Sequence, residues 1–246
     1  MTEPFYLARP DGLRLAYRHR PGHGPTLIFL PGYMSDMEGG KATALDVWAE
    51  ANGRAMLRLD YSGCGVSEGL LEEGTLTQWR DDVLFLIDSL VEGPFVLIGS
   101  SMGGWLALLV ARARPERLSA LIGIAAAPDF TDWGFTQEQK LQILREGRIE
   151  EPSEYGDAPK VTTKAFWHSG EANRLLHGTI AVDCPVRLLH GQRDEVVPWR
   201  YAITLAQQLR SADVQTLLIK DGDHRLSRDQ DIARLIEAVA TLPESI

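Results

Sequence analysis

Short runs of consecutive apolar residues recur along the chain, and longer amphipathic segments separate them. Continuous apolar runs of about four to eight residues are typical of strands covered on both faces, as in a parallel sheet. The largely apolar runs that fit this description, several of which contain one or two polar residues, are residues 26–30, 55–59, 95–98, 120–124, 186–190 and 214–219. They predict the central strands of one mainly parallel sheet.

The segments between these runs have the signals of helices. The amphipathic stretch 76–90 follows Thr75, a residue type that caps helix N-termini, and ends near Gly93. Further helices are expected over residues 40–52, 105–110, 201–209 and 229–241. Strands that alternate with helices predict parallel strands joined by right-handed crossovers. At the N-terminus, residues 5–8 and 13–17 flank a Pro-Asp-Gly turn and predict an opening hairpin.

The alternation breaks between residues 129 and 180, which lack clear strand runs and indicate short helices and loops. We expect one α/β core domain formed by residues 1–128 and 181–246, with 129–180 inserted as a cap over the carboxyl edge of the sheet. An alternative is a peripheral insertion whose aromatic residues form a small core of their own, and both descriptions can hold together. Those aromatic residues are Phe130, Trp133, Phe135, Tyr155, Phe166 and Trp167.

Composition narrows the classes of function. A chain of 246 residues, 44% hydrophobic and 24% charged, can bury one sizeable core. Its net charge of −9 argues against binding to nucleic acid or to anionic membranes. The 2 cysteines are too few for a disulfide framework and are compatible with a reducing compartment. No segment resembles a signal peptide, a transit extension or a membrane span, so we expect a cytoplasmic protein without integral membrane association.

The most specific motif is Gly99-Ser100-Ser101-Met102-Gly103, which follows an apolar strand and precedes a helix. A strand, a Gly-x-Ser-x-Gly turn and a helix form the nucleophile elbow of α/β-hydrolases. Side chains at Gly99 or Gly103 would collide with neighbouring backbone in such a sharp turn. The motif predicts an α/β-hydrolase fold with Ser101 as nucleophile.

A serine nucleophile needs a histidine base and an orienting carboxylate, in the chain order Ser, acid, His for this fold. Of the 6 histidines, His224 lies in a polar loop after the last strand, where the base is expected. His190 ends a strand ahead of any acid in its loop. Asp194, which follows that strand, is the predicted acid, with Glu195 and Asp223 as rivals.

The tetrahedral oxyanion of acyl transfer needs two backbone N–H donors. One donor follows the nucleophile, which assigns it to Met102. The other comes from the loop after the early strand, where Gly32 allows close approach, and we assign it to Tyr33. The chemistry requires no cofactor, and no Cys/His cluster has the spacing of metal ligands.

Several motifs together are similar to one family. They are Phe29-Leu30-Pro31-Gly32-Tyr33, Asp60-Tyr61-Ser62-Gly63-Cys64-Gly65, Gly99-Ser100-Ser101-Met102-Gly103-Gly104-Trp105, Cys184-Pro185-Val186-Arg187-Leu188-Leu189-His190-Gly191, Val197-Pro198-Trp199 and Asp223-His224-Arg225. The chain resembles the α/β-hydrolase-domain family that contains the mitochondrial acyl-protein (palmitoyl) thioesterase, also described as an acyl-glucuronide esterase. By matching motif, the family's triad falls on Ser101, Asp194 and His224. The resemblance implies removal of palmitoyl groups.

The expected function is therefore that of a serine esterase or thioesterase, which cleaves small-molecule or acylated-protein substrates through an acyl-enzyme. One alternative is a peptidase or amidase with the same triad, for which Glu150, Glu151 and Glu154 could recognise a charged substrate terminus. Another alternative is a hydrolase-fold receptor that binds a ligand and turns it over slowly.

Overall fold

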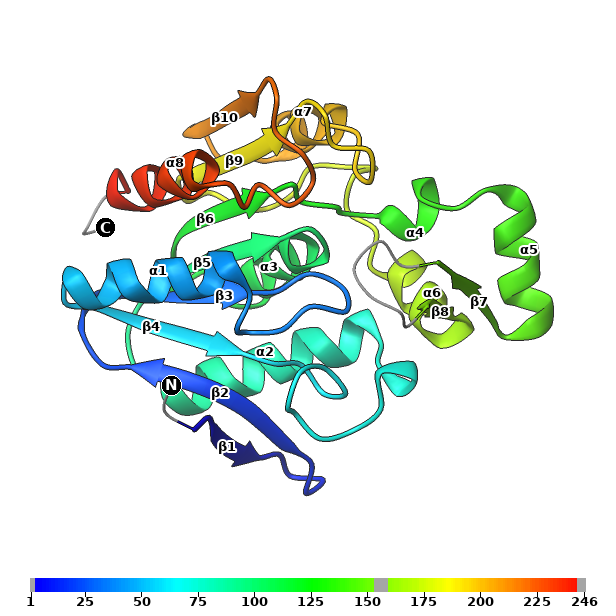
Figure 1. Cartoon of the computed structure of the whole chain (residues 1–246), viewed down its shortest axis with the longest axis horizontal. Helices are drawn as coiled ribbons and strands as arrows, with labels where there is room; N and C mark the ends of the chain where they lie inside the picture. Colours follow the sequence, from blue (N-terminus) through cyan, green and yellow to red (C-terminus); the bar gives the residue numbers. More distant parts are fainter. Residues whose placement is uncertain (1–2, 153–158, 243–246) are drawn as a thin grey trace.

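The computed structural model describes residues 3–152 and 159–242. Within them, an eight-stranded sheet has the order β1-β2-β4-β3-β5-β6-β9-β10, and only β2 runs against the other strands (Figure 1). The strands are β1 (Phe5–Ala8), β2 (Arg14–Arg20), β3 (His23–Leu30), β4 (Arg54–Leu59), β5 (Phe95–Ser100), β6 (Leu118–Ile124), β9 (Val186–Gly191) and β10 (Val214–Ile219). This arrangement confirms the predicted mainly parallel sheet.

The opening hairpin forms as expected, with Phe5 opposite Tyr17 and Ala8 opposite Arg14. Strand β2 continues past its predicted end at Tyr17, because it also pairs with β4 as far as Arg20. Residues 18–20 are Arg, His and Arg, so the pattern of apolar residues did not predict that the strand continues through them. The Arg20 guanidinium donates to the Asp46 carboxylate at 2.9 and 3.2 Å, so neighbouring carboxylates compensate the charge.

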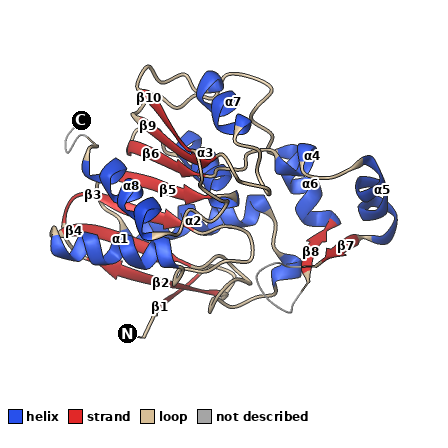
Figure 2. Cartoon of the chain, turned by 45° about the horizontal axis from the view of Figure 1, so that its top comes forward, coloured by secondary structure: helices blue, strands red, loops and turns tan. Residues whose placement is uncertain are grey.

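Helices cover both faces of the sheet (Figure 2). One face packs against α1 (Gly40–Ala51) and α8 (Asp229–Ala240). The other packs against α2 (Leu76–Leu90), α3 (Met102–Ala113) and α7 (Arg200–Gln208). Burial on both faces explains why the middle strands β5 and β6 consist almost entirely of apolar residues.

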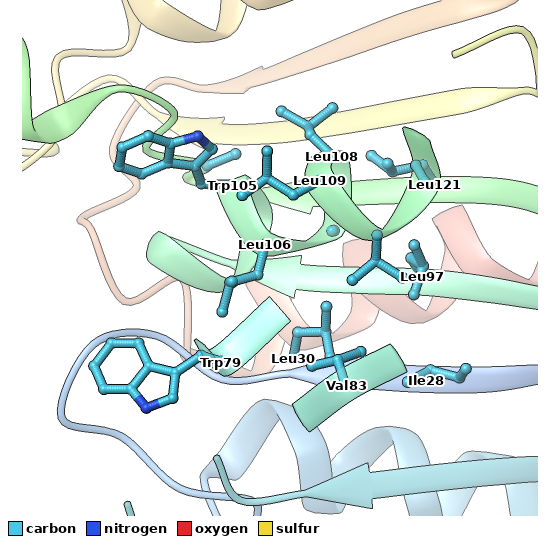
Figure 3. Packing of buried hydrophobic residues seen from close by; sticks show 14 of the residues in the cluster. Ile28, Leu30, Trp79, Val83, Leu97, Trp105, Leu106, Leu108, Leu109 and Leu121 are labelled. Atoms are coloured by element: carbon cyan, nitrogen blue, oxygen red, sulfur yellow. The ribbon is translucent and has the colours of Figure 1, made fainter. Parts of the chain in front are cut away.

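The core on the second face is built from large side chains of α2 and α3 that lie over the middle strands (Figure 3). Trp79 and Trp105 are fully buried, as are Leu30 of β3 and Leu97 of β5. Removing each large apolar side chain from water contributes about 1.5–3 kcal/mol. Helix α3 is thereby fixed on the sheet, and its N-terminus stands at the carboxyl end of β5.

The segment between β6 and β9 extends beyond the carboxyl ends of the parallel strands (Figure 1). It contains α4 (Phe130–Trp133), α5 (Gln137–Glu146), β7 (Arg148–Glu151), β8 (Lys160–Thr163) and α6 (Lys164–Ala172). The expectation of helices and loops alone was wrong, since β7 and β8 pair as an antiparallel ribbon. Ile149 is the buried residue of β7 and Thr162 that of β8, so neither strand shows an apolar run. Glu154 and Tyr155 lie outside the described residues.

This segment has a small apolar core, as the alternative description expected. Phe135, Ile143 and Ile149 are buried together, and Phe130 and Trp167 pack against them. Buried Asp129 holds the two ends of the segment together, because its carboxylate accepts hydrogen bonds from the backbone N–H groups of Leu175 and Leu176, after α6.

Gly103→Ala is expected to destabilise the fold strongly. A Cβ at this position, one residue into α3, would overlap the carbonyl oxygens of Leu30 and Pro31. Backbone cannot move aside as a flexible side chain can, so the free energy of unfolding should fall by about 3 kcal/mol or more. That loss corresponds to a Tm lower by roughly 6–12 °C in thermal unfolding. Gly40→Ala is the control, since a Cβ there meets no atom within 4 Å; an equal loss in both variants would contradict the prediction.

Candidate active site

Ser101 stands at the turn between β5 and α3, in a backbone conformation that serine rarely adopts. Its φ is 54° and its ψ is −120°, and positive φ values are uncommon for residues other than glycine. The turn is held by the Ser101 N–H, which donates to the Ile124 carbonyl at 2.9 Å. A Cβ on Gly99 would overlap the backbone of Gly103, which confirms the predicted crowding of this turn. The hydroxyl is therefore presented from a rigid, strained position.

The structure brings the three residues of the predicted triad together from separate loops. His224 Nε2 lies 3.1 Å from Ser101 Oγ, and His224 Nδ1 lies 2.8 Å from Asp194 Oδ2. Asp194 follows β9 and His224 follows β10, so adjacent parallel strands deliver both groups to the same edge as Ser101. A hydroxyl, an imidazole and a carboxylate in this order can transfer the serine proton to the imidazole.

Asp194 is buried and heavily hydrogen-bonded. Its Oδ1 accepts from the backbone N–H groups of Val196 at 2.9 Å and Val197 at 2.7 Å. Burial alone would raise the pKa of the Asp194 carboxyl, but hydrogen bonds from His190, His224 and the Val197 amide lower it well below the ordinary range. The carboxylate is therefore ionised at neutral pH.

The two rival acids lie elsewhere. Glu195 is exposed. The exposed Asp223 accepts a hydrogen bond from the Leu226 N–H at 2.9 Å and so closes the turn before α8. Among the three candidate carboxylates, Asp194 is the one hydrogen-bonded to His224.

The loop after β3 passes beside the serine. A Cβ on Gly32 would lie 3.4 Å from the Ser101 Cβ, so the loop backbone comes within van der Waals distance. Among the described residues, the N–H groups of Tyr33 and Met102 donate to no acceptor. Two unused backbone donors close to a serine hydroxyl are the elements of an oxyanion hole.

The side chain of Tyr33 connects this loop to the segment 129–180. Its ring lies 5.8 Å from that of Trp79 and 5.1 Å from that of Phe166, between centroids, and its hydroxyl donates to the Val161 carbonyl of β8. Burial, with the nearby Cys64 and Glu72, raises the pKa of the Tyr33 hydroxyl above its ordinary value. The neutral hydroxyl therefore remains a donor, and the position of the loop depends on the inserted segment.

A cavity of about 80 Å³ lies next to Ser101. Its wall is mostly aromatic and aliphatic, with one cation among the described lining residues. The lining consists of Tyr33, Ser101, Met102, Ala127, Phe130, Trp133, Gly134, Phe135, Lys160, Val196 and Val197. This wall suits an apolar group attached to the carbon that the serine would attack.

Two buried charged or titratable residues beside this site were not predicted to take part. Asp129 anchors the inserted segment, and His190 contacts Asp194 with a separation of 3.1 Å between Nε2 and Oδ2. His190 was not predicted to be the base, because it ends a strand ahead of any acid in its loop. Its position near the end of β9, just before the loop that carries Asp194, was the signal that could have linked the two residues.

The described residues offer neither a reactive thiol nor a metal site as an alternative active site. Cys64 is buried, and burial with the nearby Asp60 and Asp82 raises the pKa of its thiol to about 12, which disfavours the reactive thiolate. Within residues 3–152 and 159–242, no group of three or more His, Cys, Asp or Glu side chains is arranged to hold a metal ion. The helices of the same residues are all too short or too polar to cross a bilayer.

Comparisons with known proteins agree with this architecture. The profile of the family described as alpha/beta hydrolase fold matches residues 25–177. Human palmitoyl-protein thioesterase ABHD10, a mitochondrial protein, is 42% identical over 249 residues, which cover 100% of this chain and 81% of that protein. The structure of alpha/beta hydrolase domain-containing protein 10 from mouse superposes with a TM-score of 0.91 at 42% identity and covers 98% of both chains. A putative hydrolase from Agrobacterium vitis S4 gives a TM-score of 0.91 at 37% identity, again over 98% of both chains. The chain therefore belongs to the α/β-hydrolase family, and within it to the group that contains palmitoyl-protein thioesterase ABHD10.

Proposed function

We propose that this hydrolase cleaves carboxylic esters and thioesters through an acyl-enzyme on Ser101. The observation that carries the proposal is the hydrogen-bonded series Ser101–His224–Asp194, which lies beside an apolar cavity. No cofactor takes part in this chemistry.

The reaction follows from the positions of the groups. Ser101 Oγ attacks the acyl carbonyl carbon while its proton passes to His224 Nε2, and Asp194 stabilises the imidazolium through Nδ1–H. The negative charge on the carbonyl oxygen is stabilised by the N–H groups of Tyr33 and Met102. His224 then gives its proton to the leaving thiol or alcohol as the C–S or C–O bond breaks. Water, activated by His224, attacks the acyl-serine and releases the carboxylic acid.

The substrate class is proposed from the cavity and the relatives together. The relatives named palmitoyl-protein thioesterase act on an apolar acyl chain carried by a protein, and the apolar lining here suits an acyl chain. The cavity of about 80 Å³ is far smaller than sites for sizeable ligands, which run from about 300 Å³ upward. We therefore propose that residues 129–180 act as a cap that moves to admit a long chain. Acylated proteins and small acyl esters are the proposed substrates, and the cytoplasmic location stays a prediction.

The direct test is the initial rate of hydrolysis of p-nitrophenyl esters from acetyl to palmitoyl, with palmitoyl-CoA alongside. We expect hydrolysis that disappears in Ser101→Ala and increases toward long chains or the thioester. A preference for short esters that depends on Ser101 would keep the serine hydrolase and exclude the long-chain assignment. Equal inactivity of both proteins on every substrate would contradict the proposal.

A peptidase or amidase is less well supported, because two of the three acidic residues suggested for binding a charged terminus have other contacts. Glu150 pairs with Arg148 at 2.8 Å, and Glu151 accepts a hydrogen bond from Gln139 at 2.9 Å. A slowly reacting receptor would be supported by a ligand that raises Tm without a burst of product.

A further inference from the structure

His190 is a fully buried histidine at the end of β9 that has no role in the reaction as described above. Its Nε2 lies 2.9 Å from the Val197 carbonyl oxygen and 3.1 Å from Asp194 Oδ2. Its Nδ1 is buried and has no hydrogen-bond partner among the described residues. The ring therefore makes both of its polar contacts through one nitrogen.

These contacts define the protonation state of His190. Both neighbours of Nε2 are acceptors, so Nε2 carries the hydrogen and shares it between them. A second proton on Nδ1 would leave a buried N–H without an acceptor, which is costly. His190 is accordingly a neutral imidazole in the Nε2–H tautomer.

The consequence at Asp194 is a carboxylate whose four acceptor directions are all used. Oδ1 accepts from the N–H groups of Val196 and Val197, and Oδ2 accepts from His224 Nδ1 and His190 Nε2. Val197 closes a ring, because its N–H donates to Asp194 and its carbonyl accepts from His190. This ring leaves the carboxylate no freedom to rotate, and it directs one lone pair of Oδ2 at His224.

We propose that His190 is a positioning residue, which acts on His224 through Asp194; the proposal deepens, and rests on, the proposed serine mechanism. It fixes the plane of the carboxylate and shares its negative charge. Without the His190 donor, Oδ2 can turn away from His224, so the base is less well aligned with Ser101.

The test compares two replacements of similar shape. His190→Gln keeps an N–H donor at the same bond distance from Cα as Nε2, and His190→Met removes it. With a p-nitrophenyl ester, we expect His190→Met to lower kcat by up to about 100-fold, the scale for a misplaced catalytic group, with KM nearly unchanged. His190→Gln should retain most of the wild-type kcat.

A double-mutant cycle separates positioning from general packing. If His190 acts through Asp194, then His190→Met has no further effect on kcat in an Asp194→Asn background. An equal loss in both backgrounds, or a loss in His190→Gln as large as in His190→Met, would overturn the proposal. The charged neighbours of His224 along its own loop, Asp223 and Arg225, are the same in every variant.

NMR of the histidine nitrogens gives a readout that does not depend on turnover or on folding of the methionine variant. In the wild-type protein at neutral pH, His190 should show the Nε2–H tautomer; an Nδ1–H tautomer or a doubly protonated ring would overturn the proposal. If the wild-type protein hydrolyses no ester, the proposed function fails, while the tautomer of His190 still decides whether its Nε2–H is directed at Asp194.

Discussion

Replacing Ser101 with alanine is expected to lower kcat for ester and thioester hydrolysis by about a million-fold, the loss seen when a serine nucleophile is removed. The reason is that, among the described residues that line the cavity, Ser101 is the one whose hydroxyl is hydrogen-bonded to an imidazole. The loss corresponds to about 8 kcal/mol of transition-state stabilisation, at 1.36 kcal/mol for each factor of ten. The measurement is the pre-steady-state burst and steady-state rate on a p-nitrophenyl ester.

Folding and ligand binding serve as controls for this variant. Among the described residues, the side chain of Ser101 makes one hydrogen bond, to His224, so Tm should change little. Ser211→Ala, in the turn before β10, removes a comparable hydroxyl that accepts from the Asp213 N–H and should leave kcat unchanged. Residual burst kinetics in Ser101→Ala would identify a different nucleophile and contradict the proposed mechanism.

Replacing Asp194 with asparagine should cost about 10,000-fold in kcat, since it disturbs the tautomer of the histidine base. Four N–H groups point at the Asp194 carboxylate, two at each oxygen. An asparagine presents an NH₂ group on one side, so in either orientation two donors face a donor. His224 can then hold its hydrogen on Nε2, where it can no longer accept the proton of Ser101.

The same substitution should change the pH dependence of stability. The folded-state pKa of Asp194 is depressed, so the charged carboxylate stabilises the fold above the unfolded-state pKa of about 3.9. That contribution is lost as pH falls below this value. Wild type should therefore exceed Asp194→Asn in unfolding free energy at pH 7, and the difference should shrink in acid. Denaturant unfolding at several pH values measures it.

Asp223→Asn is the matched control, because Asp223 neighbours His224 in the chain but has its carboxylate on the Leu226 N–H. We expect it to retain most of the wild-type kcat. A larger loss of kcat in Asp223→Asn than in Asp194→Asn would show that Asp194 is not the acid partner of His224.

The two loss-of-function predictions rest on residues that could be named from local sequence. The elbow around Ser101 is a local pattern, because a sharp turn between a buried strand and a helix requires small residues at fixed positions. His224 and Asp194 followed from chain order, since parallel strands deliver the loops at their carboxyl ends to one edge of the sheet. The structure places all three within hydrogen-bonding distance.

Contacts between segments far apart in the chain could not be predicted from local sequence patterns or from chain order. Strands β7 and β8 carry few apolar residues and pair with each other rather than with the main sheet. Tyr33 contacts β8 at Val161, 128 residues further along the chain. The spacing of apolar residues along the chain does not predict such a contact, because the contact depends on how the inserted segment packs against the core.

The sequence alone determined the alternation of strands and helices, the strained serine turn and the chain order of the proposed catalytic groups. These features depend on burial and backbone conformation, which neighbouring residues encode. The tertiary structure alone decided that His190 shares the carboxylate of Asp194, that Asp223 closes a turn, and that Tyr33 joins the loop beside Ser101 to the inserted segment. Each of these depends on the direction of a side chain in the packed molecule, which is settled by neighbours far away in the sequence.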